Sequence, residues 1–313
     1  MPQLKVVKPR TSSALEKLVD DYFVHCRAAG LSPKTVRFGY GYPLSFVFLP
    51  WCAEHGVTDV AQVTNRELDR LGADLNEKGG KRGQLSKHSI WTYMKAINRF
   101  LAWAKEEGEG SGARAQLPRL TQKVIEVLSR DEVKRIENTA QNERDELIVR
   151  ILGDTGLRVG ELVALRISDI RQESRQYTLR VRGKGDRERL VPITPELHRR
   201  LTRYIATKRR ANSASDRVFL SRRKVQDQYE PLTEAGIQQL IRDLGQRAGI
   251  ERRVHPHLFR HSAATFLLQQ GMNPLLVAQI LGHSSLAMIQ KVYAHLTVAD
   301  ASAAMMKALR PET

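Results

Sequence analysis

The chain has 313 residues, of which 41% are hydrophobic, enough to bury a sizeable core and to suggest two domains. It contains no run of about 18 apolar residues, which excludes a membrane-spanning helix, and its two cysteines, Cys26 and Cys52, do not make a disulfide framework. The 51 Lys and Arg side chains exceed the 34 Asp and Glu side chains by 17, which favours a polyanionic partner, most often nucleic acid.

The surplus charge is uneven, with 16 basic and 12 acidic side chains in residues 1–110 but 35 and 22 in residues 111–313. A basic surface that binds nothing would give the same balance, so the motifs must decide. The N-terminal MPQLKVVKPRTSS has no apolar core, so no secretory signal is expected. Neither cysteine lies in a CxxC pair, and we therefore expect a cytoplasmic protein without a metal site or cofactor.

Four helices are predicted in the first hundred residues. Apolar residues at helical spacing indicate a helix over 13–29 that ends at Gly30. The later helix starts are marked by capping residues, which are Ser32 with Pro33, Thr64 with Glu67 in a capping-box pattern, and Ser86. Four helices in about 95 residues predict a small all-α domain.

The last of these helices, which should run to about residue 107, carries several polar and basic side chains. Lys87, Tyr93, Lys95 and Arg99 are candidates for contact with DNA phosphates. An ordinary solvated helix face is the slightly commoner explanation for any one of them.

A segment rich in glycine and polar residues, EGEGSGARAQLP, follows at 108–118. This composition is typical of a flexible linker. Its flexibility would allow two domains to close around a cylindrical ligand.

The second half of the chain alternates helices with one hairpin. Strand-like alternation over 177–182 and 187–193 flanks the glycine-rich turn 183–186 and predicts a β-hairpin. Helices are predicted near 130–140 after a capping box at Ser129, and near 143–154, 195–209, 234–248, 256–270 and from Asn273-Pro274 to just before Gly282.

Arg158 follows a turn broken by Gly156 and begins a helix. A guanidinium placed there can donate to two phosphate oxygens, and Glu161, one helical turn later, could orient it. A surface pair between Arg158 and Glu161 is the commoner explanation of this spacing.

Lys184 lies at the tip of the predicted hairpin, between two glycines. From such a turn a lysine can reach into a groove and donate a proton to a leaving oxygen. A solvated turn lysine is the alternative.

His257 and Arg260 are spaced i,i+3 near the start of a predicted helix. The helix N-terminus attracts anions, and a histidine beside a phosphate-binding arginine suits phosphoryl transfer. Chance spacing would also produce this pair, and the adjacent His261 is interpreted as structural.

Near the C-terminus, His283 in LGHSS could hydrogen-bond a phosphate oxygen. Tyr293 carries a hydroxyl whose ordinary pKa is about 10, so it is a useful nucleophile only where cations favour the phenolate. On its own Tyr293 would more often be a core or surface aromatic, and His295 is interpreted as a surface residue.

The ordered blocks TGLR, GKG, HLFRH, LGHSS and VYAHL together strongly resemble the tyrosine recombinase (phage integrase) family. The resemblance implies a mainly α fold with a small antiparallel β-sheet. It places an N-terminal helical, SAM-like core-binding domain at 13–107, a linker at 108–121 and a mixed α+β catalytic domain at 122–313. The resemblance therefore implies a two-domain recombinase, such as a Xer-type resolvase, an integron-type enzyme or a transposon-borne enzyme.

The resemblance also implies a site and a reaction. Its catalytic residues would be Arg158, Lys184, His257, Arg260, His283 and the nucleophile Tyr293. The expected activity is cleavage and rejoining of DNA through a 3′-phosphotyrosine, without metal or cofactor. Relaxation of DNA by a type IB topoisomerase-like enzyme, or a catalytically inactive DNA-binding regulator, are the alternatives.

The partners implied are double-stranded DNA and further recombinase subunits, as a homotetramer, or a heterotetramer with a second recombinase, on two DNA sites. The target sequence and the purpose, whether integration, chromosome dimer resolution or transposition, stay open.

One spacing departs from the family pattern, because Tyr293 lies ten residues after His283 where nine is usual. One added residue rotates a helical position by about 100°. We expect the loop at Ser284 and Ser285, or a local bulge, to absorb it.

Overall fold

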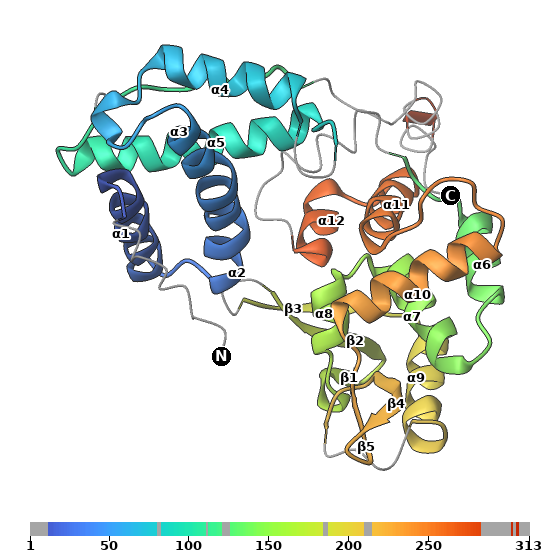
Figure 1. Ribbon diagram of the computed structural model, residues 1–313. Coiled ribbons are helices and arrows are strands. Elements are labelled where there is room, and N and C mark those ends of the chain that lie inside the picture. The colour runs from blue at the N-terminus through green and yellow to red at the C-terminus, as the bar shows by residue number, and fades with distance from the viewer. Residues whose placement is uncertain are drawn as a thin grey trace, which may run out of the picture. The chain divides into compact units, whose positions relative to one another are not determined.

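The computed structural model of the chain describes residues 12–79, 83–110, 112–120, 126–183, 187–209 and 215–282, together with 302, 305 and 306 (Figure 1). The chain divides into two compact units, Met1–Gln122 and Lys123–Thr313. The helices in the described part of the chain are too short or too polar to cross a membrane.

The described part of the first unit is helical, as predicted. Its helices are α1 (Ala14–Ala28), α2 (Pro33–Thr35), α3 (Leu49–Glu54), α4 (Asn65–Glu77) and α5 (Lys87–Glu106). Two π-helical stretches, Val36–Gly41 and Leu44–Phe48, join α2 to α3, and a 3₁₀ turn spans Val60–Gln62. Pro43, which has no N–H to donate, lies between the two π-helical stretches.

The predicted caps form, with one difference. The hydroxyl of Thr64 accepts the backbone N–H of Glu67 at 3.3 Å, but the Glu67 carboxylate pairs with Arg70 at 2.9 Å and does not return to the cap. The capping box predicted at Thr64 is therefore only half formed, whereas both halves form at Ser129.

The core of the first unit is built around large aromatic side chains. Phe48 and Phe100 are fully buried, and Tyr22 packs edge-on against Phe100. The side chains of Lys87, Lys95 and Arg99, on the same helix as Phe100, are exposed. A phosphate-binding surface and an ordinary solvated face both require this exposure, so it does not distinguish between them.

Part of the predicted linker packs against this unit. Ala115 is buried, and its backbone exchanges hydrogen bonds of 2.7 and 2.9 Å with the side-chain amide of Asn98 on α5. The segment around Ala115 is thereby held against α5.

The second unit contains seven helices and five strands among its described residues. The helices are α6 (Arg130–Asn138), α7 (Glu143–Thr155), α8 (Val159–Ala164), α9 (Pro195–Thr207), α10 (Glu234–Arg247), α11 (Pro256–Gln269) and α12 (Pro274–Leu281). The strands are β1 (Ile170–Glu173), β2 (Gln176–Arg182), β3 (Glu188–Pro192), β4 (Leu220–Val225) and β5 (Gln228–Pro231).

The strands form two small antiparallel sheets, one in the order β1-β2-β3 and one of β4 with β5. The predicted hairpin is the β2–β3 pair, in which Val181 is opposite Arg189 and Arg182 is opposite Glu188. The mainly helical fold with a small antiparallel sheet is thus confirmed. Strand β1 and the β4–β5 hairpin were not predicted.

Helix α7 lies at the centre of the second unit, and its Leu147, Ile148 and Ile151 are fully buried. The helix packs against α6, α9 and α11. Its partner α11 contributes the fully buried Phe259 to the same core. This packing fixes the start of α11, where His257 and Arg260 lie.

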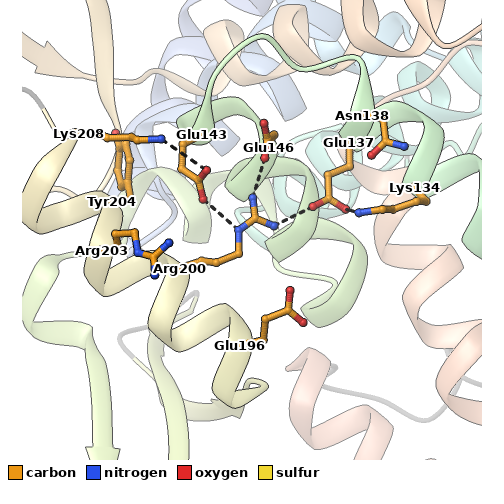
Figure 2. A pocket seen from close by; sticks show the side chains of 10 residues that line it. All are labelled: Lys134, Glu137, Asn138, Glu143, Glu146, Glu196, Arg200, Arg203, Tyr204 and Lys208. Atoms are coloured by element: carbon orange, nitrogen blue, oxygen red, sulfur yellow. Dashed lines mark hydrogen bonds and ion pairs between the residues drawn. The ribbon is translucent and has the colours of Figure 1, made fainter.

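A network of ion pairs joins α6, α7 and α9 on the surface of this core (Figure 2). The guanidinium of Arg200 donates to Glu137, Glu143 and Glu146 at 3.0, 3.0 and 2.7 Å. These residues line a hollow of about 580 Å³. Because the three carboxylates converge on one arginine, we interpret the network as structural.

Candidate active site

The candidate active site is a cavity of about 780 Å³ in the second unit, at the meeting point of α8, the β2–β3 hairpin, α11 and α12. Arg158 and His257 line it, and Arg260 lies behind its wall, 3% exposed. Gly183 and Arg187, which flank the segment 184–186 in the sequence, line it too, as does Gly282, which precedes His283. Lys184, His283 and Tyr293 themselves lie outside the described residues.

Arg158 occupies the N-cap position of α8, directly after a sharp end to α7. Gly156 adopts φ +61°, the left-handed conformation that ends α7 and turns the chain back. The backbone N–H of Arg158 donates to Glu161 Oε2 at 2.9 Å, and its Nη1 donates to Oε1 at 2.8 Å. The predicted Arg158–Glu161 contact therefore exists, and the Glu161 side chain is buried, so the two do not form an ordinary surface pair.

Arg260 is held from two directions. Its Nη1 donates to the carbonyl of Gly156 at 2.8 Å and its Nη2 to the carbonyl of Leu281 at 2.6 Å. Burial and the charge of Arg158 lower the pKa of Arg260 to about 9, so the group stays cationic at neutral pH.

The C-terminal end of α12 receives a guanidinium on each of three consecutive carbonyls. Arg189 Nε donates to Ile280 O at 2.7 Å, Arg260 Nη2 to Leu281 O, and Arg158 Nη2 to Gly282 O at 2.9 Å. The last carbonyls of a helix have no hydrogen-bond partners within the helix, and here the guanidiniums supply partners. Cations at this end also interact favourably with the helix dipole. The backbone that leads into His283 is thus fixed by three arginines.

Arg189 is a residue of this site that the sequence did not reveal. Its Nη1 and Nη2 donate to Glu161 Oε1 and Oε2 at 2.9 and 2.8 Å. The one available signal was the alternation of β3, which puts Arg189 on the same face as the fully buried Val191 and so predicts a charge in need of a partner.

The electrostatics of the site favour an anionic ligand. Burial alone would raise the pKa of Glu161, but hydrogen bonds from Arg189 and Arg158 and the charge of Arg189 hold it below its usual range. The cavity is lined by four arginines and three glutamates, which are Arg158, Arg182, Arg187, Arg189, Glu161, Glu188 and Glu234, and Arg260 lies behind its wall. Five guanidiniums thus outnumber three carboxylates among the described residues, so the cavity keeps an excess of positive charge. A phosphodiester carries the charge that would balance it.

His257 is exposed at the start of α11 and faces the same cavity. Partial desolvation and the charges of Arg260 and Arg158 lower the pKa of His257, so its imidazole is mainly neutral at pH 7. A neutral imidazole can accept a proton. His261, interpreted as structural, is half-buried on α11, and His295 lies outside the described residues.

Comparisons with known proteins agree with this architecture. The profile of the Phage integrase family matches residues 126–300. The tyrosine recombinase XerA of Pyrococcus horikoshii is 30% identical over 308 residues, which cover 98% of this chain and 99% of that protein.

Two solved structures extend the likeness. The XerH site-specific recombinase bound to a palindromic difH substrate in a post-cleavage complex has a TM-score of 0.70, with 21% identity over 92% of this chain and 83% of that one. A lambda integrase tetramer bound to a Holliday junction has a TM-score of 0.66, with 17% identity over 87% of this chain and 77% of that one. At these identities both show the shared fold.

The fold, the cationic cavity and the sequence likeness define a tyrosine-type site-specific DNA recombinase. The chain belongs to the phage integrase family of tyrosine recombinases, and its relatives include the Xer recombinases.

Proposed function

We propose that the chain cleaves and rejoins DNA through a covalent bond between Tyr293 and a 3′-phosphate. The phenol oxygen of Tyr293 attacks the phosphorus, the bond to the 5′ oxygen breaks, and a 5′-hydroxyl is released. The 5′-hydroxyl of a partner strand then attacks the phosphotyrosine and regenerates the phenol, so strands are exchanged without an external energy source.

Five side chains besides Tyr293 have a part in this reaction. Arg158 and Arg260 stabilise the negative charge that develops on the non-bridging oxygens. His257 accepts the proton of Tyr293, Lys184 donates a proton to the leaving 5′ oxygen, and His283 donates a hydrogen bond to the phosphate.

The observation that carries this proposal is that Arg158 and Arg260, 102 positions apart in the sequence, bond neighbouring carbonyls beside one cavity that His257 also faces. Such convergence of cations without a matching number of carboxylates is suited to a backbone phosphate. It supports roles for all three residues, and the family likeness extends these roles to Lys184, His283 and Tyr293.

We further propose that the partner is double-stranded DNA and that four copies act on two sites. The XerH and lambda integrase relatives were solved on DNA, the latter as a tetramer on a Holliday junction. The basic surplus of 17 charges supports the DNA partner. The chain would work in the cytoplasm, and mapping its bound sequence tells whether it serves a mobile element or chromosome dimer resolution.

A plasmid assay tests the proposal. The target site is first recovered by selecting bound duplexes from a random DNA pool and footprinting them. A plasmid with two such sites should then give recombinant circles with the wild-type protein and none with Tyr293→Phe. Relaxation of the plasmid without recombinant circles would instead establish a topoisomerase-like activity, and binding without any cleavage would establish an inactive regulator.

A further inference from the structure

We propose that Arg189 is a positioning residue for DNA cleavage, which acts by tying the buried carboxylate of Glu161 to the end of α12. This inference rests on the proposed function of the site. Arg189 lines the cavity too, but all three of its side-chain nitrogens are bonded to Glu161 or to Ile280 O, so its effect would pass through the groups that it holds.

The contacts of Arg189 reach two other elements from β3. Both terminal nitrogens bind the Glu161 carboxylate on α8, at 2.9 and 2.8 Å, and Nε binds Ile280 O on α12 at 2.7 Å. The side chains are 12% and 5% exposed for Arg189 and Glu161, so water competes little for these bonds. Only a guanidinium carries two terminal nitrogens and a third donor, Nε, in one plane, so no other side chain could make all three bonds.

The first consequence concerns Arg158. Glu161 orients it through two bonds, and the same carboxylate oxygens also accept from Arg189. Without Arg189, the carboxylate would be free to rotate toward Arg158 and pull its guanidinium away from the cavity. Arg189 therefore fixes the direction in which Arg158 presents its remaining N–H groups.

The second consequence concerns the chain after α12. Gly282 adopts φ +68°, and a Cβ built on it would lie 2.9 Å from Arg189 Cζ. The Arg189 side chain thus packs directly against the residue that precedes His283. A bond to Ile280 O and close packing at Gly282 define where the segment carrying His283 and Tyr293 begins.

The third contact lies at the turn end of the hairpin, directly after β2. A Cβ built on Gly183 would lie 3.9 Å from both Arg189 Nη1 and Glu161 Oε1, so the last residue before Lys184 packs on this ion pair. The Glu161–Arg189 pair is accordingly the point where α8, α12 and the hairpin meet.

Arg180 provides a matched control. It lies on the neighbouring strand β2 and donates from Nε to the buried carboxylate of Asp169 at 2.9 Å, with its own side chain 22% exposed. Removing it breaks a similar arginine–carboxylate pair in the same sheet, but Asp169 bonds neither Arg158 nor the end of α12 among the contacts of the described residues.

The experiment compares Arg189→Met, Arg189→Lys and Arg180→Met with the wild type. Each is assayed for affinity and for the single-turnover rate of covalent adduct formation on a nicked duplex that carries the selected site. We expect Arg189→Met to keep its affinity within about threefold and to cleave 10- to 100-fold more slowly. Arg189→Lys should recover only part of the rate, and Arg180→Met should cleave at the wild-type rate.

A substrate with sulfur in place of the 5′-bridging oxygen identifies the step affected. A thiolate leaves without needing a proton, so a defect confined to Lys184 would disappear on it, whereas a defect in the placement of Arg158 and the tyrosine segment would persist. Persistence of the Arg189→Met defect supports the inference. Restoration of the rate on this substrate, or equal loss in Arg180→Met, would overturn it, while absence of cleavage by the wild type would instead remove the proposed function.

Discussion

The guanidinium groups of Arg158 and Arg260 donate to adjacent backbone carbonyls, those of Gly282 and Leu281, at 2.9 and 2.6 Å. The two side chains come from α8 and α11 but are aligned by the same helix end. Each terminal nitrogen has a second hydrogen, so both groups can be held by the protein and still donate to a phosphate. The site is therefore preorganised by the backbone at the end of α12.

Replacing Arg260 by lysine and replacing Arg158 by lysine should lower the stability by different amounts. Arg260→Lys removes bonds to two buried carbonyls, and we expect a loss of about 2–4 kcal/mol in unfolding free energy. Arg158, whose side chain is 38% exposed, should change stability by less than about 1 kcal/mol on the same substitution.

Both substitutions should reduce single-turnover cleavage by about 10²- to 10³-fold, because each removes a planar donor that faces the developing charge. Thermal melting and adduct formation measure the two effects separately. Equal stability losses, or near wild-type cleavage by either variant, would contradict the site as described.

Gly282→Ala should disturb the site through a direct collision. A methyl group there would lie 2.9 Å from Arg189 Cζ, in addition to the cost of about 1–2 kcal/mol for a left-handed alanine. Gly271→Ala is the matched control, since Gly271 has φ +81° and nothing within 4 Å of its added Cβ. We expect similar backbone strain in both but a loss of cleavage rate only in Gly282→Ala; a similar cleavage loss in Gly271→Ala would exclude the collision as its cause.

The cleavage rate should depend on pH through His257. Its pKa is lowered by partial desolvation and by Arg260 and Arg158, so protonation sets in only below the ordinary value near 6.5. The rate should fall as pH drops through this lowered pKa, because the imidazole can no longer accept the tyrosine proton. His257→Gln should reduce the rate and flatten that acid limb, while His198→Gln on α9 should keep it; an unchanged limb in His257→Gln would assign the base to another group.

The Arg200 network should matter for stability and not for chemistry. Burial would raise the pKa of Glu137, but hydrogen bonds from Arg200 and Lys134 and the charge of Arg150 hold it below its usual range. The stabilisation that the Glu137 carboxylate contributes to the folded state is therefore fully present above its pKa in the unfolded chain, near 4.3. It is lost as the pH falls through the lower pKa of the folded protein. Arg200→Met should cost about 3 kcal/mol at pH 7, measured by thermal melting, with the cleavage rate of the folded protein unchanged. A selective loss of cleavage would assign this hollow a role in the reaction.

Local chemistry made much of the helical framework predictable. The caps at Ser86, Ser129 and Asn273 depend on residues within three positions, so their bonds can be inferred from sequence. The β4–β5 hairpin escaped prediction because Gln226 and Asp227 hold its positive-φ turn, where glycine or asparagine would have signalled it.

The residues of the site could be predicted from the sequence only through the family resemblance. Arg158 and Arg260 were predicted as site residues from their motifs, but nothing local in the sequence indicated that they share the end of α12. Arg189 has its partners 28 and 91 positions away, and single-sequence patterns do not report contacts of that range. The effect of the ten-residue interval from His283 to Tyr293 lies outside the described residues and stays a prediction.

Peptide mapping of the covalent adduct identifies the nucleophile itself. The wild-type protein is trapped on a nicked duplex carrying its selected site, digested with trypsin and nuclease, and analysed by mass spectrometry. We expect a nucleotide 3′-phosphate on the peptide that contains Tyr293, and no adduct with Tyr293→Phe. A nucleotide attached to any other residue, or an adduct that survives Tyr293→Phe, would contradict the assignment of Tyr293 as the nucleophile.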